Sequence, residues 1–337
     1  MNDGQAQPVM QHADVVVIGA GVAGLTAAMI AAGHGVSTLV IEQLAPGGQV
    51  ATIETIRNFP GFPDGIAGYE LGPLLQQQAE AAGAVVQLDS VSTIAVDGSD
   101  YRVICADEEI ATRAVIIAAG SSLRQLGVPG EAEFTGRGVS HCAACDGPLL
   151  KGQPVIVIGG GDSAFDEALV LAGHASEVTL IHRGSSPSAR PCAIAQLAAL
   201  PHVRIIANAE VVAIEGDKAL TGVAIRRGAA IEHEPCRAVF AYIGLEPRTG
   251  FLQDLIALDA GGHIVTDLMM RASRPGLLAA GDIRAGSVNI LASVAGDAAT
   301  AAISAVRYLR MVRENKNAEW EGHDFGVAER SRTASGR

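Results

Sequence analysis

The feature that most constrains the fold of this chain is a glycine-rich turn between an apolar strand and a helix, and it occurs twice. The first copy places Gly19–Gly24, with the pattern G-x-G-x-x-G, after an apolar strand over 15–18 and before an alanine-rich helix that ends at Gly33. A second strand over 38–41 then ends at Glu42. This β-α-β arrangement is typical of Rossmann-like domains, whose turn holds the pyrophosphate of a dinucleotide.

Each residue of the first turn has a physical role. Gly19 permits the tight turn, Gly21 lets a pyrophosphate approach the backbone, and Gly24 lets the helix pack closely on the strand. The start of the helix offers free N–H groups and a positive dipole end to the phosphates. Glu42, about 20 residues beyond the turn, can accept hydrogen bonds from ribose hydroxyls. These four residues therefore predict a dinucleotide site.

The second copy has a different ending. Its turn follows a strand over 154–158, a helix over 165–171 comes next, and a further strand over 178–181 runs into His182 and Arg183. No carboxylate stands where the first copy has Glu42, and a guanidinium favours a ribose that carries a 2′-phosphate. We therefore predict FAD at the first turn and NADPH at the second, where the site residues are Gly159, Gly161, Asp162, Ser163, Ala164, His182 and Arg183.

The order of these units predicts the domain organisation. A third apolar strand with a small-residue turn, over 277–282, precedes an alanine-rich segment over 291–309, so the last part of the chain is expected to return to the first domain. The predicted fold is α/β, with two Rossmann-like, three-layer dinucleotide-binding domains, the second inserted into the first. We expect an FAD-binding domain over 1–118 and 247–314, an NAD(P)H-binding domain over 119–246 and a mobile tail over 315–337.

Charge and composition narrow the choice of partners and compartment. The net charge of −12 argues against nucleic acid, because no basic surface is available to replace phosphate counterions. The uncharged stretch over 15–33 resembles a membrane or signal segment, but four glycines interrupt it and residues 1–14 contain no Lys or Arg. We therefore expect no membrane segment. The odd number of cysteines, five, is unlike a secreted disulfide framework and favours the cytoplasm.

Two of the cysteines stand close together. Cys142 and Cys145 form a C-x-x-C pair within disulfide reach, especially if a helix begins there. A zinc site would need a second pair of ligands, which the sequence lacks, so no metal is predicted. His141 can either help to form a thiolate or be structural. The isolated Cys105, Cys192 and Cys236 are expected to be small buried side chains.

Taken together, the motifs resemble those of the low-molecular-weight thioredoxin reductase family. The resemblance covers residues 14–309 and is carried, in family order, by GAGVAG (19–24), PGGQ (46–49), NFPGFP (58–63), IAAGSS (117–122), CAACDG (142–147), GGGDSA (159–164) and AAGD (279–282). It implies that Gly47, Gly48 and Gln49 fold around the FAD and that Asn58 lies near the flavin. It also implies that Gly281 and Asp282 belong to the FAD site, where Asp282 binds the ribityl chain. It also implies a homodimer.

The resemblance further implies a reaction. Electrons pass from NAD(P)H through FAD to the Cys142–Cys145 disulfide and then to thioredoxin or a thioredoxin-like protein. Cys145 faces the flavin, Cys142 attacks the acceptor disulfide, and Asp146 carries the proton. One domain rotates against the other, and connections near Gly120 and over 244–247 are the expected hinge.

Two departures from the family keep alternatives open. The phosphate-binding segment of the family has two further arginines where this chain has Gly184 and Ser188, and Arg190 is two residues too far along, so NADH is also possible. Asn289–Leu291 replaces the family's Arg-Gln-Ala beside the flavin. The alternatives are a ferredoxin-dependent thiol reductase, a dithiol oxidase that uses FAD and oxygen, and a non-catalytic flavin redox sensor.

Overall fold

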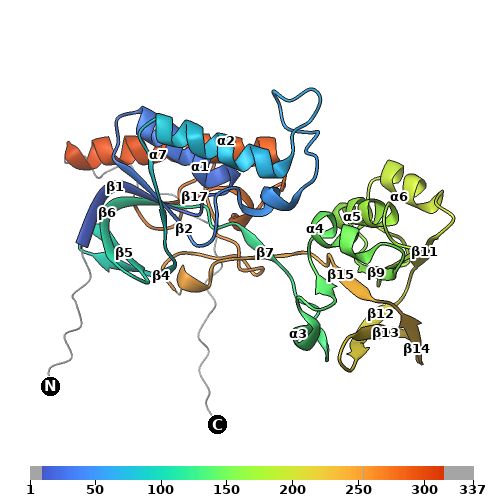
Figure 1. Ribbon diagram of the computed structural model, residues 1–337. Coiled ribbons are helices and arrows are strands. Elements are labelled where there is room, and N and C mark those ends of the chain that lie inside the picture. The colour runs from blue at the N-terminus through green and yellow to red at the C-terminus, as the bar shows by residue number, and fades with distance from the viewer. Residues whose placement is uncertain (1–9, 253, 315–337) are drawn as a thin grey trace, which may run out of the picture. The chain divides into compact units, whose positions relative to one another are not determined.

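The protein is described by a computed structural model that covers residues 10–252 and 254–314 (Figure 1). The predicted tail over 315–337 lies outside the described residues. The chain forms two compact units. Unit 1 comprises the chain up to Ser121 and again from Pro247, and unit 2 comprises Ser122–Glu246. No helix in the described ranges has the length and hydropathy needed to cross a bilayer.

Unit 1 is built on one mixed sheet with the order β3-β2-β1-β6-β5-β4, and β17 also pairs with β6. The pairs among β1, β2, β3, β6 and β17 are parallel, whereas β4, β5 and β6 are antiparallel. The strands are β1 (Met10–Ile18), β2 (Thr38–Glu42), β3 (Val85–Leu88), β4 (Val91–Asp97), β5 (Asp100–Cys105), β6 (Glu109–Ile117) and β17 (Leu277–Ala279). The helices are α1 (Val22–Gly33), α2 (Gly68–Ala81) and α7 (Leu291–Arg313), with short 3-10 turns η1 (Gly48–Thr52), η3 (Gly250–Leu252) and η4 (Gly281–Ile283).

Side chains along β1 point alternately into the two hydrophobic cores that cover the faces of the unit 1 sheet. Val15 and Val17 lie in the core that contains α1, α2 and α7, whereas Val16 and Ile18 lie in the core on the opposite face. Both faces of a central parallel strand are covered in such a sheet, which accounts for the apolar run over 15–18 at the end of β1. Figure 1 shows the three helices together on one face of the sheet.

Unit 2 is also built on a sheet with a hydrophobic core on each face. Its sheet is parallel, with the order β11-β10-β9-β15-β8. A separate antiparallel sheet has the order β12-β13-β14. Val155 and Val157 of β9 pack in the core with α5 and α6, and Ile156 and Ile158 pack in the core with the antiparallel sheet. The strands are β8 (Val139–Ser140), β9 (Pro154–Ile158), β10 (Glu177–Ile181), β11 (Val203–Ile206), β12 (Glu210–Gly216), β13 (Leu220–Arg227), β14 (Ala230–Pro235) and β15 (Ala238–Ala241). The helices are α3 (Glu131–Phe134), α4 (Ala143–Asp146), α5 (Asp162–Ala172) and α6 (Pro191–Ala198), with a 3-10 turn η2 (Gly147–Leu150).

The chain crosses between the units in two short strands that pair with each other, β7 (Ser121–Leu123) and β16 (Leu245–Pro247). Arg124 N donates to Gly244 O at 2.9 Å, and Arg248 N donates to Gly120 O at 3.0 Å. The predicted α/β class with two Rossmann-like domains is confirmed. The predicted helix over 165–171 lies within the longer α5, and the alanine-rich segment over 291–309 lies within α7.

Candidate active site

The first glycine turn, in unit 1, is shaped by close backbone contacts. Gly19 has a φ of +101°, and a Cβ there would lie 2.5 Å from Ala118 O. A Cβ on Gly24 would lie 1.7 Å from Gly19 O, so any larger residue at position 24 would clash with the turn that precedes α1. A Cβ on Gly21 would meet only Gly48 Cα, at 3.8 Å. The backbone at Gly21 is therefore open to a ligand, as a bound pyrophosphate requires.

Glu42 lies at the end of β2 beside this turn. Its Oε2 accepts a hydrogen bond from Ala20 N at 2.7 Å, and its Oε1 accepts one from Leu44 N at 3.0 Å. Each oxygen keeps a second lone pair, so the fixed carboxylate can still accept from a hydroxyl. A cavity of about 140 Å³ adjoins it, lined in part by Gly19, Asp89 and Arg248.

The PGGQ loop packs on the same turn. Gly47 N donates to Ala20 O at 2.8 Å, and Gly47 forms a bridge with Gly21. Gly47 and Gly48 have φ values of +116° and +60°, which glycine adopts without strain. Gln49 Nε2 donates to Ser121 O at 2.9 Å. Asn58 is exposed in the loop between η1 and α2, and no hydrogen bond within the described residues ties it to the turn.

The AAGD segment, residues 279–282, packs against the start of α1 next to the first glycine turn. A Cβ on Gly281 would lie 3.0 Å from Ala23 Cβ, so η4 packs on the start of α1. Burial raises the pKa of Asp282, and the Ser287 hydroxyl at 3.4 Å from its Oδ1 opposes that shift. The first glycine turn, the PGGQ loop and the AAGD segment thus meet around one open helix start, which fits a dinucleotide.

Arg284 anchors η4 to α7. Its Nε and Nη2 donate to Asp297 Oδ2 at 3.0 and 2.8 Å, and its Nη1 donates to Ala285 O at 3.0 Å. Both side chains are largely buried, with 15% and 10% exposed. Beyond this pair, Asn289 has a φ of +53° and is exposed together with Ile290, at the position where the family's flavin-side motif is missing.

The second glycine turn, in unit 2, borders a cavity of about 690 Å³. A Cβ on Gly159 would lie 2.2 Å from Tyr242 O, whereas one on Gly161 would meet only Ser188 Oγ at 3.9 Å. The turn is therefore tight at its first glycine and open at the helix start. The lining includes Gly159, Gly160, Gly161, Asp162, Ser163, His182, Arg183, Ser186 and Ser188.

The residues after β10 differ in their surroundings. Arg183 is exposed, and His182 is buried, which lowers the pKa of its imidazole. Arg190 does not line the cavity, because its guanidinium is engaged with Asp162 and Asp166 of α5. Arg190, which the sequence places two residues beyond the family's distal phosphate-binding arginine, therefore contacts carboxylates of its own unit.

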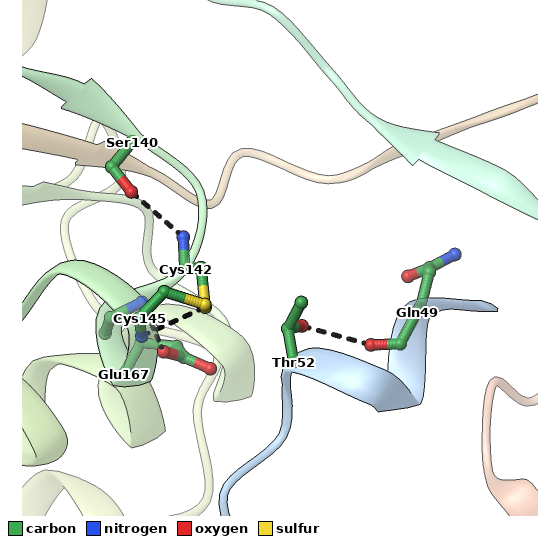
Figure 2. Close-up of a disulfide and its surroundings, with 7 residues drawn as sticks. Gln49, Thr52, Ser140, Cys142, Cys145 and Glu167 are labelled. Atoms are coloured by element: carbon green, nitrogen blue, oxygen red, sulfur yellow. Dashed lines mark hydrogen bonds between the residues drawn. A yellow bond between two sulfur atoms is a disulfide. The ribbon is translucent and has the colours of Figure 1, made fainter. Parts of the chain in front are cut away.

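The predicted Cys142–Cys145 disulfide is present, with an S–S distance of 2.09 Å (Figure 2). Cys142 is the residue that precedes α4, and its Sγ accepts a hydrogen bond from Cys145 N at 3.1 Å. Cys142 N donates to Ser140 Oγ at 3.1 Å, and Ala143 N donates to Glu167 Oε2 at 3.3 Å. Cys142 is half-buried and Cys145 is exposed. The disulfide thus lies at the surface of unit 2, at the start of a helix.

Neighbours of the disulfide include residues that the sequence did not single out. Glu167 is on α5, and Ser140 ends β8, so only the fold brings them to the pair. Burial, followed by the Glu167 carboxylate, raises the pKa of the Tyr242 hydroxyl. Asp146, the predicted proton carrier, is the last residue of α4 and is half-buried. His141 Nδ1 lies 3.4 Å from Ala241 O, at the end of β15.

One prediction about the isolated cysteines is wrong. Cys105 and Cys236 are buried as expected, but Cys192 is exposed. It lies on α6, whose buried face is formed by Ala193 and Leu197, four residues apart, so the position before Ala193 faces solvent. In the described ranges, no cluster of three or more His, Cys, Asp or Glu side chains is suited to a metal ion.

Comparisons with known proteins agree with this geometry. Residues 13–305 match the family described as pyridine nucleotide-disulphide oxidoreductase. A thioredoxin reductase of Treponema pallidum is 39% identical over 298 residues, which cover 88% of this chain and 97% of that protein. One of Bacillus subtilis is 38% identical over 305 residues, covering 89% and 96%. The crystal structure of Lactococcus lactis thioredoxin reductase matches with a TM-score of 0.85 and 36% identity, covering 88% of this chain and 99% of that one.

Proposed function

Because this chain belongs to the pyridine nucleotide-disulphide oxidoreductases, and within them to the thioredoxin reductases, we propose that its acceptor is thioredoxin or a thioredoxin-like protein. The chain is a disulfide oxidoreductase whose cofactors are FAD and NADPH. The observation that carries the proposal is the Cys142–Cys145 disulfide at an exposed helix start, in the unit that also holds the second glycine turn. A protein disulfide can reach sulfur atoms in such a position.

The nucleotide-binding roles divide between the units. We assign the FAD to unit 1, where Gly19, Gly21 and Gly24 admit its pyrophosphate and Glu42 accepts from its ribose. The remaining FAD ligands in this proposal are Gly47, Gly48, Gln49, Asn58, Gly281 and Asp282. Bound FAD supplies a two-electron carrier between the nicotinamide and the disulfide. We assign NADPH to the cavity of unit 2, with Arg183 at its 2′-phosphate.

The dithiol chemistry follows from thiol–disulfide exchange. In the reduced enzyme, the Cys142 thiolate attacks one sulfur of the acceptor disulfide, and the other acceptor sulfur leaves as a thiolate that takes a proton. The Cys145 thiolate then attacks Cys142 Sγ, which restores the enzyme disulfide and releases the second acceptor thiolate. The acceptor gains two electrons and the enzyme loses two. Asp146 is the proposed source of the proton.

A hydrogen bond supports this division of roles. Cys145 N donates to Cys142 Sγ at 3.1 Å, and a backbone N–H that points at sulfur stabilises the thiolate. Cys142 therefore has the better surroundings for the attacking thiolate. A Cys145→Ser variant should form a stable mixed disulfide with the acceptor, whereas a Cys142→Ser variant should not. The reverse result would exchange the two roles.

Quaternary structure and compartment complete the proposal. The family resemblance supports a homodimer, which light scattering of the purified protein would test. Three unpaired cysteines, Cys105, Cys192 and Cys236, suit a reducing compartment and support the cytoplasm. The expected absence of nucleic acid as a partner is supported by the net charge of −12.

The decisive experiment is an anaerobic titration of the purified flavoprotein with NADPH and with NADH, followed by flavin absorbance. Bleaching by NADPH is expected, and the Cys145→Ser variant should still bleach while losing reduction of thioredoxin. If neither nucleotide bleaches the flavin, a nicotinamide-dependent reductase is ruled out. Bleaching by reduced ferredoxin, or by a small dithiol, would then identify one of the alternative electron donors.

A further inference from the structure

The segment after His182 folds back onto the second glycine turn. Ser188 stands where the family has its distal phosphate-binding arginine. Its backbone N donates to Gly160 O at 2.8 Å, and its Oγ donates to the same oxygen at 3.2 Å. Two residues later, Arg190 N donates to Asp162 Oδ1 at 2.7 Å. These three hydrogen bonds fasten the loop before α6 to the start of α5.

The Arg190 side chain continues this attachment with ion pairs. Its Nη2 donates to both oxygens of Asp166, at 2.7 Å each, and its Nε lies 3.3 Å from Asp162 Oδ1. The two carboxylates are one helical turn apart, at i and i+4, so one guanidinium spans both. All three side chains are about half exposed, with 51–55% of their surface accessible.

This ion-pair cluster lies where it can affect the binding of a nucleotide in the large cavity. Asp162 is the first residue of α5 and lines the large cavity, together with the open backbone of Gly161. A negative charge in the first turn suits the helix dipole, but it opposes a second anion at the same place. A pyrophosphate that approaches Gly161 meets the Asp162 carboxylate, with the Asp166 carboxylate one turn further along α5, and Arg190 offsets part of their charge.

A different arginine remains for the 2′-phosphate. Among the residues that the structure describes, two arginines line the cavity, Arg124 and Arg183. Arg124 Nε lies 3.4 Å from Glu246 Oε1. Arg183 has no ion pair within the described part of the chain, and it is the second residue after β10, where a ribose is expected.

We propose that Arg190 is a positioning residue that neutralises and fixes Asp162 and Asp166, so that the pyrophosphate of a nicotinamide dinucleotide can bind at the start of α5. In this arrangement Arg190 does not contact the 2′-phosphate, and Arg183 alone supplies the guanidinium that distinguishes NADPH from NADH. The inference rests on the proposed function, because it takes unit 2 to be the nicotinamide-binding unit.

The test compares binding of NADP⁺ and NAD⁺ to the FAD-loaded protein by calorimetry at low ionic strength. Arg190→Ala should weaken both nucleotides by a similar factor, on the order of fivefold to tenfold for one lost charge near a diphosphate. The ratio of the two affinities should stay constant, and added salt should shrink the effect. Arg183→Ala is the matched control, and it should weaken NADP⁺ while leaving NAD⁺ nearly unchanged.

A second substitution distinguishes an electrostatic effect of Arg190→Ala from an effect on folding. Replacing Asp162 by Asn in the Arg190→Ala background removes the opposing charge, so the affinity for both nucleotides should recover. If Arg190→Ala does not fold, Arg190→Lys, which keeps the charge, should bind both nucleotides as well as the wild type, whereas Arg190→Gln, which removes the charge, should weaken both.

Three results would overturn the inference while the proposed function still stands. A loss in Arg190→Ala that is confined to NADP⁺ would make Arg190 a 2′-phosphate ligand. Unchanged affinity for both nucleotides would leave it without a role in binding, and an absent rescue would remove the electrostatic argument. If the wild-type protein binds neither nucleotide, the proposed function itself fails, and the inference fails with it.

Discussion

The Arg284–Asp297 pair gives a quantitative test of how unit 1 is held together. Arg284 donates two hydrogen bonds to Asp297 Oδ2 and one to a backbone carbonyl, and only 15% and 10% of the two side chains are exposed. Replacing Arg284 by Met leaves the Asp297 carboxylate buried without its partner. Breaking a buried pair in this way costs about 3–5 kcal/mol of stability.

A surface pair provides the matched control. Arg226 Nη1 lies 3.2 Å from Glu210 Oε2, but the side chains are 54% and 62% exposed. Solvent screens such a pair, so Arg226→Met should cost about 0–1 kcal/mol. The free energy of unfolding would be measured for both variants by urea denaturation, followed by far-UV circular dichroism.

Two further readouts sharpen the comparison. A double variant, Arg284→Met with Asp297→Leu, should recover most of the lost stability, because both charges leave the interior together. Since Arg284 holds η4 against α7, Arg284→Met should also retain less FAD than Arg226→Met after desalting. If Arg284→Met is no less stable than Arg226→Met, the burial of the pair does not determine its energetic importance, and the reasoning fails.

The remaining predictions concern glycine geometry and thiol reactivity. Gly24→Ala should yield protein without bound flavin, measured by the absorbance ratio near 450 and 280 nm, because its Cβ would lie 1.7 Å from Gly19 O. Gly33→Ala, whose Cβ meets nothing within 4 Å, should keep the flavin, and a yellow Gly24→Ala protein would contradict the assignment. At pH 8 iodoacetamide should label the exposed Cys192 of the oxidised protein and spare Cys105 and Cys236. Burial, followed by nearby carboxylates, raises the pKa of both spared thiols to about 12, so they stay protonated at that pH. Peptide mass spectrometry would locate the label, urea should expose all three sites, and native labelling of Cys236 would refute the argument.

The parts of the site that are local in sequence were predictable. The turns at Gly19 and Gly159 each depend on a strand, a helix and a glycine spacing within about 30 residues. The disulfide between Cys142 and Cys145 depends on two residues in one helical turn. For such features the residue types and their spacing carry nearly all of the physical constraint.

The parts of the site that depend on tertiary contacts could not be predicted from the sequence. Whether Arg190 faces a phosphate or a carboxylate is decided by Asp162 and Asp166, about 25 residues away in the sequence and adjacent only after α5 packs. Glu167 reaches the backbone beside the disulfide for the same reason. The exposure of Cys192 depends on which face of α6 is buried, and a short helix with a mixed pattern does not reveal that in advance.

The pairing of β7 with β16 has a consequence for how the chain could be divided. Because the strands that leave and re-enter unit 1 are hydrogen-bonded neighbours, the two ends of unit 2 lie side by side. Removing Ser122–Glu246 and joining the cut ends with a few residues would leave the pairing of β17 with β6 untouched. Unit 2 therefore has the geometry of a module that can be excised, transplanted or circularly permuted without rebuilding its host sheet.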